Sequence, residues 1–419
     1  MNPLYEQIRK TPLLANIGSL FIIQLMNYVI PIVVIPVLVA RLGLSNYGTI
    51  ATAQYFSALL MFACDYGFVY TGPQQVSQNQ ENRAFLNSIF STITVIKFVF
   101  LAVSVLVTFI YCSMVKMTVE EARVTYISLL AVAGSVLTPL WFLQGVQRIK
   151  SLTIISIVFK LLQLVLLLVC IHGKTDVLLA SIVFFGANFL LGLTSFIYTM
   201  VYFKIRFVLP KITQVVKELK TGFNMFLSVF FSSVYIQGTG LFLEFITGSK
   251  ELVALYSAAE KIVRAATSLF NPFIQAFLPF ISKMFMMNRQ LGSMIFFKFL
   301  YVVLGVTLFT SLMVYLFSGI VVHVLFKPEF EPAIALMAIL CPVVVFGNMA
   351  NLLGNNLYLL LGWQRVTVIV MFLLAIFNTA MCYLLIPGQG ATGAAIALTC
   401  TEALGALSFY AYYRYKNRF

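Results

Sequence analysis

The sequence predicts an all-α polytopic membrane protein with twelve transmembrane helices arranged as two six-helix halves. Three observations support this fold class. Of the 419 residues, 61% are hydrophobic and only 10% are charged, whereas soluble chains carry about 25% charged residues. Twelve apolar stretches are long enough to cross the bilayer, and a short signature recurs in the two halves of the chain.

Each predicted span has the length that a membrane helix needs, about 20 residues. The first apolar run is too long for a cleavable signal peptide and lacks a small-residue cleavage site, so we expect it to remain as the first membrane helix. The predicted spans are 14–40, 47–70, 84–112, 124–146, 152–171, 177–202, 223–246, 252–281, 291–317, 332–361, 366–386 and 392–412.

The positive charges predict which loops face the cytoplasm. With both termini inside, 16 of the 27 Lys and Arg residues lie in the cytoplasm, six lie outside and five lie within spans, as the positive-inside rule requires. Topology therefore explains the net charge of +14, and we expect no nucleic-acid partner. The six outer residues are Arg41, Lys116, Arg123, Lys174, Lys250 and Lys327.

Two internal similarities indicate a duplicated half-protein. A Gly-x-Gln-Arg signature occurs at 145–148 and at 362–365, 217 residues apart, and Ala-Thr-Ala-Gln at 51–54 resembles Ser-Ala-Ala-Glu at 257–260 with an offset of about 206. Six spans per half give both halves the same orientation, as in parallel repeats whose substrate site lies between them. The predicted domains are an N-terminal lobe at 1–203, a basic cytoplasmic linker at 204–221 and a C-terminal lobe at 222–419.

The sequence offers no catalytic apparatus. All predicted loops are short, and no Gly-rich phosphate loop followed by Lys and Ser or Thr is present, so we expect a transporter and not an enzyme, with no cofactor. The six Cys residues show no paired spacing. His172 and His323 have no metal-ligand neighbours in the sequence, so we expect neither a disulfide nor a metal site.

Charged side chains inside the spans are the first candidates for a substrate site, because a charge in hydrocarbon costs at least about 2.5 kcal/mol and usually faces a cavity or a partner. Lys97, Lys160 and Glu402 lie near the middle of their spans. Lys298 lies close enough to a helix end for its amine to reach the membrane interface. The first three are therefore the stronger candidates.

The predicted span at 252–281 carries Glu260, Lys261 and Arg264 within five residues. Glu260 and Arg264 are spaced i, i+4 and can pair along one helix face, as in a purely structural salt bridge. This pair leaves Lys261 without a counter-charge, and its spacing of three from Arg264 can place both cations on one side facing a cavity. That second interpretation predicts a site for a phosphate or pyrophosphate group.

Amide side chains form a second set of candidates. Asn348, Asn351 and Asn355 recur at i, i+3 and i+7, which places them on one stripe of a helix. Amides offer donors and acceptors to sugar hydroxyls, so the stripe could line a sugar-binding cavity. Interhelical hydrogen bonding would use the same residues, and the sequence leaves both interpretations open.

Several motifs in the first half are distinctive in combination. They are Asn27-Tyr28 with Pro31 and Pro36, followed by Arg41-Leu42-Gly43 and Tyr47-Gly48; Asp65-Tyr66-Gly67-Phe68 before the polar loop to Arg83; and Trp141-Phe142-Leu143-Gln144-Gly145 leading to Arg148 and Lys150. With these motifs the whole chain resembles the polysaccharide-transport branch of the exporter superfamily that also contains multidrug extruders and lipid II flippases. Most narrowly, it resembles an O-antigen repeat-unit flippase.

The resemblance implies two pseudo-symmetric six-helix lobes around a central cavity. It further implies that the protein moves an undecaprenyl-pyrophosphate-linked oligosaccharide from the cytoplasmic to the periplasmic leaflet of a bacterial inner membrane by alternating access. The implied partners are this lipid-linked glycan and membrane lipids, and glycan polymerase machinery is a further candidate partner.

On this basis we expect pyrophosphate or lumen contacts from Lys97, Lys160, Lys261 and Arg264, with Glu260 orienting Arg264 and Glu402 as a candidate for proton coupling. The alternative is a cation-coupled multidrug extruder of the same superfamily. Such an extruder is expected to carry a carboxylate in its first helix, and the span at 14–40 contains none.

Overall fold

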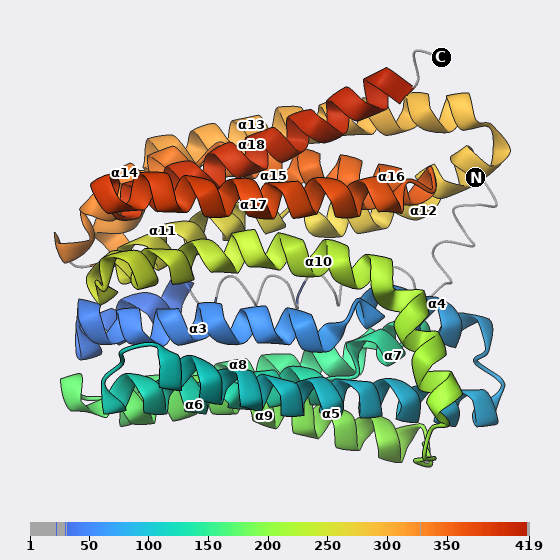
Figure 1. Ribbon diagram of the computed structural model, residues 1–419, viewed down its shortest axis with the longest axis horizontal. Helices are drawn as coiled ribbons and strands as arrows, with labels where there is room; N and C mark the ends of the chain where they lie inside the picture. The colour runs from blue at the N-terminus through green and yellow to red at the C-terminus, as the bar shows by residue number, and fades with distance from the viewer. Residues whose placement is uncertain (1–21, 23–29, 31, 327, 417–419) are drawn as a thin grey trace, which may run out of the picture. The chain divides into compact units, whose positions relative to one another are not determined.

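The computed structural model describes residues 22, 30, 32–326 and 328–416, and every regular element within them is a helix (Figure 1). In this part of the chain nine helical segments are long and apolar enough to cross a membrane, so the expectation of an all-α multi-pass membrane protein is confirmed. The nine segments are Arg83–Met114, Val119–Gly145, Ile149–Cys170, Lys174–Tyr202, Ile212–Thr247, Arg289–Leu325, Val343–Leu360, Gln364–Gln389 and Ala391–Lys416.

The other three predicted spans are helical where they are described. The first lies mostly outside the described residues, and its described end is the helix Ile32–Leu42. The second, predicted at 47–70, is α3 (Leu44–Asp65), and it ends early because Tyr66 and Gly67 have left-handed backbones, with φ of 45° and 74°. The eighth span was predicted as one helix at 252–281. This prediction is wrong, because the segment forms two helices, α11 (Lys250–Ser268) and α12 (Asn271–Met287).

Prolines divide several predicted spans into shorter helices. A proline near the start of α12 suits a helix N-terminus, where its missing N–H is not needed. Pro139 separates α6 (Val119–Leu137) from α7 (Leu140–Gly145). Pro342 separates α14 (Pro332–Leu340) from α15 (Val343–Ala350), because proline removes a backbone donor and blocks an uninterrupted helix.

The chain divides into two compact units, and each is described by itself. Among the described residues, the first unit contains residue 22 and those from Phe56 to Phe230, and the second contains residues 30 and 32–55 together with those from Phe231 onward. The divisions therefore fall inside α3 and inside α10 (Ile212–Thr247). The lobe boundaries predicted from the internal repeat remain a prediction.

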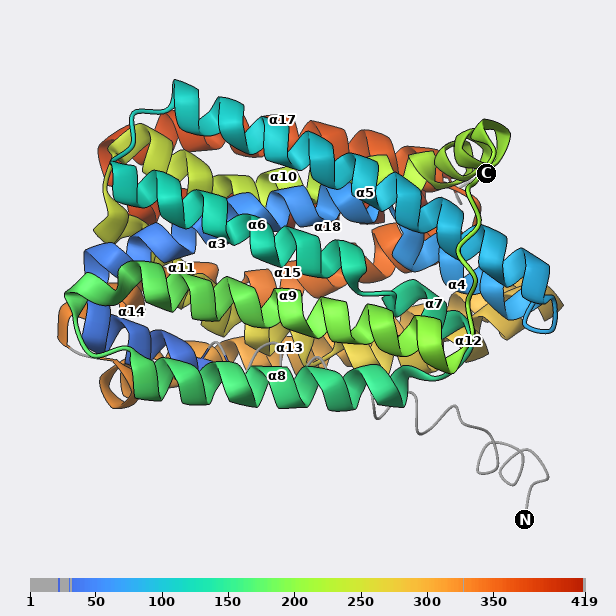
Figure 2. The ribbon, with the colours of Figure 1, turned by 90° about the horizontal axis from the view of Figure 1, so that it is seen from below.

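The first unit is built from the end of α3, α4 (Phe68–Gln78), α5 (Arg83–Met114), α6, α7, α8 (Ile149–Cys170), the 3₁₀ turn Lys174–Asp176, α9 (Val177–Tyr202) and the start of α10. An aromatic core that includes Phe90, Trp141 and Phe142 joins α5 to α7. Helices α6 and α9 pack closely (Figure 2), since a Cβ on Gly134 would lie 2.3 Å from the Asn188 carbonyl oxygen. Glycine thus sets the spacing of these two backbones.

The second unit contains the start of α3, the end of α10, and α11 to α18. Its later helices are α13 (Arg289–Leu325), α16 (Tyr358–Leu360), α17 (Gln364–Gln389) and α18 (Ala391–Lys416), with a 3₁₀ turn at Pro328–Phe330 and a π-helical segment, Asn351–Leu357, between α15 and α16. Helix α17 runs beside α18 (Figure 1). Short π segments occur frequently at functional sites, and this one adjoins the pocket described below.

The two Gly-x-Gln-Arg signatures form turns whose registers differ by two residues. Gln147 and Gly362 both have left-handed backbones, with φ of 56° and 74°. In each turn the next residue, Arg148 or Trp363, donates its N–H to the carbonyl five residues earlier, which is the Schellman pattern of a helix end. Gln147 and Gly362 are therefore structural equivalents, and Gly145 instead packs against α4, where a Cβ would not fit.

Candidate functional site

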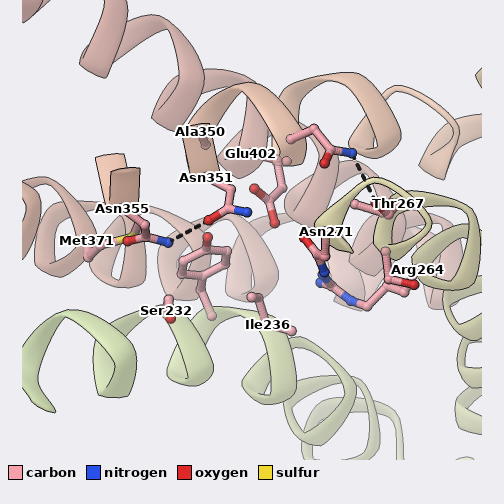
Figure 3. Close-up of a pocket in the computed structure, with 14 residues that line it drawn as sticks. Ser232, Ile236, Arg264, Thr267, Asn271, Ala350, Asn351, Asn355, Met371 and Glu402 are labelled. Atoms are coloured by element: carbon pink, nitrogen blue, oxygen red, sulfur yellow. Dashed lines mark hydrogen bonds between the residues drawn. The ribbon is translucent and has the colours of Figure 1, made fainter. Parts of the chain in front are cut away.

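The second unit contains a pocket of about 210 Å³ between α10, α11, α12, α15, the π-helical segment, α17 and α18 (Figure 3). Its lining is polar for a site inside a helix bundle, with one guanidinium, one carboxylate and several amides and hydroxyls. The lining residues are Ser232, Tyr235, Ile236, Arg264, Thr267, Ser268, Asn271, Gly347, Asn348, Ala350, Asn351, Asn355, Met371 and Glu402. Seven helical segments therefore contribute to one set of hydrogen-bonding groups.

Among the described residues, Arg264 is the only Lys or Arg that lines this pocket. Its Nε lies 2.6 Å from Glu260 Oε1, so the predicted i, i+4 pair forms along α11. Its Nη2 is buried and has no hydrogen-bond partner among the described residues. Figure 3 shows the guanidinium pointing into the pocket toward Asn271. A single carboxylate contact thus leaves part of the cation available to an anionic ligand.

Glu402 of α18 lines the same pocket and is only 4% exposed. Its carboxylate lies next to Gly347 of α15, where an added Cβ would be 3.7 Å from Glu402 Oε2. The pocket therefore combines a buried carboxylate with a guanidinium. This combination is suited to exchanging a counter-charge when an anion enters or leaves.

The three asparagines of the predicted stripe all line the pocket but make different contacts. Asn348 donates to the carbonyls of Thr267 at 3.2 Å and Val344 at 2.8 Å, so it joins α15 to α11. Asn355 donates to Asn351 Oδ1 at 3.1 Å, and Figure 3 shows the two amides side by side in the lining of the pocket. Asn348 thus makes the interhelical bond, while Asn351 and Asn355 offer groups to a ligand.

Lys261 does not line the pocket, although it lies three residues from Arg264. Its Nζ donates to Gln54 Oε1 and, at 3.2 Å, to the Tyr47 hydroxyl, and it lies 5.5 Å from the centre of the Tyr47 ring. The two cations of α11 therefore face different surroundings. One faces the pocket, and the other faces α3.

Lys97 belongs to the first unit and is paired. Its Nζ lies 2.8 Å from Asp65 Oδ1 and donates to the Ser135 carbonyl at 3.0 Å. The Lys97 side chain is 3% exposed, against 30% for Asp65. The pair links α5 to the end of α3 and to the end of α6, as a structural ion pair would.

Lys160 lies half-buried on α8 of the first unit. No hydrogen bond or ion pair of its amine is seen within the described part of the chain. Of the four cations predicted from the sequence, Lys160 is thus the one whose amine contacts no polar group of the described residues, and Arg264 is the one with an unpartnered, buried Nη2.

Sequence reasoning missed several polar residues of this region. Tyr235 and Asn271 line the pocket, and Tyr55 donates its hydroxyl to Glu260 Oε2 at 2.5 Å. Tyr55 directly follows the segment at 51–54 that resembles 257–260. That similarity was the available signal, since it placed α3 and α11 at equivalent positions of the two halves.

Comparisons with known proteins agree with this architecture. The model of the family described as "Polysaccharide biosynthesis protein" matches residues 13–285. A "Putative O-antigen transporter" of Escherichia coli K12 is 26% identical over 399 residues, covering 94% of this chain and 95% of the relative. A protein of the same description from Shigella dysenteriae is 26% identical over 273 residues, covering 64% of this chain and 67% of the relative.

Solved structures show the same fold at low sequence identity. An inward-facing multidrug resistance transporter of the MATE family and MOP superfamily matches with a TM-score of 0.76 and 11% identity, covering 94% of each chain. The lipid II flippase MurJ in an inward closed conformation matches with a TM-score of 0.74 and 12% identity, covering 96% of this chain and 87% of MurJ. Because the family model spans well over half of its residues, this chain belongs to the polysaccharide biosynthesis protein family, and its fold is that of the MOP-superfamily transporters.

Proposed function

We propose that this protein is a flippase that moves an undecaprenyl-pyrophosphate-linked oligosaccharide, an O-antigen repeat unit, from the cytoplasmic to the periplasmic leaflet by alternating access. The observation that carries the proposal is the match to an O-antigen transporter over 94% of this chain, within a polysaccharide biosynthesis family. The fold, shared with a flippase of another lipid-linked glycan, supports it.

The pocket of the second unit suits such a substrate chemically. Arg264 offers an unsatisfied guanidinium nitrogen to a phosphate oxygen, and guanidinium groups bind phosphate through paired N–H donors. Asn351 and Asn355 offer amides to sugar hydroxyls. In this proposal Glu260 orients Arg264, Glu402 takes part in coupling, and Lys160 and Lys261 act on the substrate path, while Lys97 keeps its structural pairing with Asp65.

The proposed location is the bacterial inner membrane with both termini in the cytoplasm. The distribution of 16 inner and six outer basic residues supports this orientation. Glycan polymerase machinery on the periplasmic side is a proposed partner, since a translocated repeat unit needs an acceptor there.

Complementation of a flippase-deficient strain tests the function, with the lipid-linked glycan assayed on each face of the membrane. We expect the wild-type gene to restore surface glycan and Arg264→Ala to abolish it at unchanged protein abundance. Lys298→Ala is the matched control, because Lys298 is an exposed cation on α13 outside the pocket. Glycan export by Arg264→Ala at the wild-type level would refute the site.

The same strains distinguish glycan translocation from cation-coupled drug export. The similarity to a MATE transporter does not decide between them, because it shows only a common fold. A flippase restores glycan and leaves drug resistance unchanged. A drug extruder raises the resistance of the cells and leaves the lipid-linked glycan on the cytoplasmic face.

A further inference from the structure

Helices α3 and α11 are joined by a line of polar contacts within the second unit, which we call the α3–α11 seam. Its members are Tyr47, Gln54 and Tyr55 of α3 and Ser257, Glu260 and Lys261 of α11. The two helices approach closely, because a Cβ on Gly48 would lie 2.0 Å from the Lys250 carbonyl oxygen. Glu260 and Tyr55 are each only 4% exposed, so the seam is a buried contact.

The internal repeat relates two hydrogen bonds of the seam to each other. With the offset of 206 residues, Gln54 corresponds to Glu260 and Tyr55 corresponds to Lys261. The bond from Tyr55 to Glu260 therefore corresponds to the bond from Lys261 to Gln54. A contact in which equivalent residues exchange partners has the form of an isologous interface. The seam thus joins equivalent helices of the two halves about a local pseudo-twofold axis.

Glu260 connects this seam to the pocket through its two carboxylate oxygens. Oε2 accepts the Tyr55 hydroxyl at 2.5 Å, and Oε1 accepts Arg264 Nε at 2.6 Å. Nε and Nη2 lie on the same side of a guanidinium group, where a carboxylate normally binds both. Here Nη2 has no partner among the described residues. Glu260 Oε2, the oxygen that would complete the two-bond pair, is instead directed at the Tyr55 hydroxyl.

The position of Tyr55 is itself fixed by packing. Its ring lies against Gly240 of α10, where an added Cβ would come within 2.4 Å of the ring. The ring also contacts Tyr256 of α11, with centroids 6.3 Å apart. Tyr55 can therefore hold Glu260 only while α3 stays packed on α10 and α11.

We propose that Tyr55 is a positioning residue that keeps Arg264 able to bind a phosphate-type oxyanion. While the seam is closed, Tyr55 restricts Glu260 to a single bond with Arg264, and the guanidinium binds the anion in the pocket. When α3 separates from α11, Glu260 Oε2 is released and pairs with Arg264 Nη2, which takes the donor that the anion used and releases the anion. The inference rests on the proposed function only in assigning this anion to a lipid-linked substrate.

The test uses full-length protein in nanodiscs and two probes, inorganic pyrophosphate and undecaprenyl pyrophosphate. Tyr55→Phe removes the hydroxyl that holds Glu260. Tyr256→Phe is the matched control, because it removes the hydroxyl of a buried tyrosine that packs beside Tyr55 and lies outside the pocket. We expect Tyr55→Phe to raise the Kd of both probes by about tenfold and Tyr256→Phe to leave it within about twofold.

A double variant separates positioning from a general loss of packing. In Tyr55→Phe/Glu260→Gln the amide cannot form the charged two-bond pair, so we expect the Kd to return to within about threefold of the wild-type value. A structural role for Tyr55 predicts further weakening instead. Unchanged binding by Tyr55→Phe, or no recovery in the double variant, would overturn the inference.

The two probes and the complementation assay keep this inference distinct from the proposed function. Wild-type binding of both probes shows that the shared phosphate chemistry suffices, and binding of the lipid alone assigns the anion to a lipid headgroup. Glycan export by the wild type together with unaltered probe binding by Tyr55→Phe rejects the inference and retains the flippase. A Tyr55 effect on pyrophosphate binding in a protein that moves no glycan retains the inference and rejects the flippase.

Discussion

At the scale of single residues, the buried charges have different functions that their sequence positions did not separate. The Glu260–Arg264 pair was predictable, because both residues lie on one helix at i, i+4 spacing. The partners of Lys97 and Lys261 were not, since they lie on other helices, and Gln54 is 207 residues from Lys261. Only three-dimensional packing shows that Lys97 is already neutralised while Arg264 keeps a free donor.

The Lys97–Asp65 contact leads to a prediction about stability. Asp65→Asn should destabilise the first unit by about 3 kcal/mol, because it leaves the buried Lys97 ammonium without a counter-charge. Lys97→Met should cost less, since Asp65 remains 30% exposed and can be hydrated. Thermal unfolding of the purified protein, monitored by size-exclusion chromatography, measures the loss of stability in both variants.

The double variant Asp65→Asn/Lys97→Met removes both charges, so we expect it to recover most of the lost stability. Lys298→Met, at an exposed position of α13, serves as the control for loss of a cation. If Lys97→Met is fully stable and yet transports no glycan, Lys97 acts on the substrate and the structural assignment is incorrect.

At the scale of helices, the hydrophobic runs predicted the membrane segments, and prolines explain where they break. The spans at 124–146 and 332–361 were predicted as single helices, but Pro139 and Pro342 divide them. The π-helical segment Asn351–Leu357 has no comparable sequence signal. It depends on tertiary contacts, such as the hydrogen bond from Thr367 to the Gly354 carbonyl at 2.9 Å.

The glycine contact between α6 and α9 leads to a prediction about packing. Gly192→Leu should strongly destabilise the first unit, because even a Cβ at this position would lie 2.1 Å from the Gly134 carbonyl oxygen. Gly186→Leu on the same helix should be tolerated, since nothing lies within 4 Å of its added Cβ. Protein abundance in the membrane and the midpoint of thermal unfolding compare the two variants. Equal stability of both would show that α6 and α9 do not pack through these glycines.

At the scale of the whole molecule, composition and charge were sufficient to predict the fold class. A chain with 61% hydrophobic residues and few charges had to be a multi-pass helical membrane protein. The internal repeat also predicts that α3 and α11 are equivalent helices of the two halves. The division of the described chain inside α3 and α10 could not be inferred, because hydrophobic patterning does not show which neighbours a helix packs against.

The orientation in the membrane is a prediction that cysteine labelling can test. In a variant without the six native Cys residues, cysteines placed at Lys116 and Lys174 should react in intact spheroplasts with a maleimide that cannot cross the membrane. Cysteines at Lys150 and Arg206 should react only after the membrane is opened, since these positions belong to the basic cytoplasmic side. The reverse pattern would contradict the predicted orientation.

The paired hydrogen bonds of the α3–α11 seam also have an evolutionary consequence. If each half descends from a separate subunit, the ancestor was a homodimer, and one pair of residues had to serve on both sides of its twofold axis. A fusion of two such subunits into one chain would remove that requirement. In this chain Lys261 bonds to Gln54, and Tyr55 bonds to Glu260. Of the two equivalent positions, 54 and 260, only position 260 therefore carries a carboxylate, and this carboxylate contacts Arg264. Asymmetry of this kind is unavailable to a symmetric dimer, and it allows one half of a duplicated protein to specialise in binding an anion.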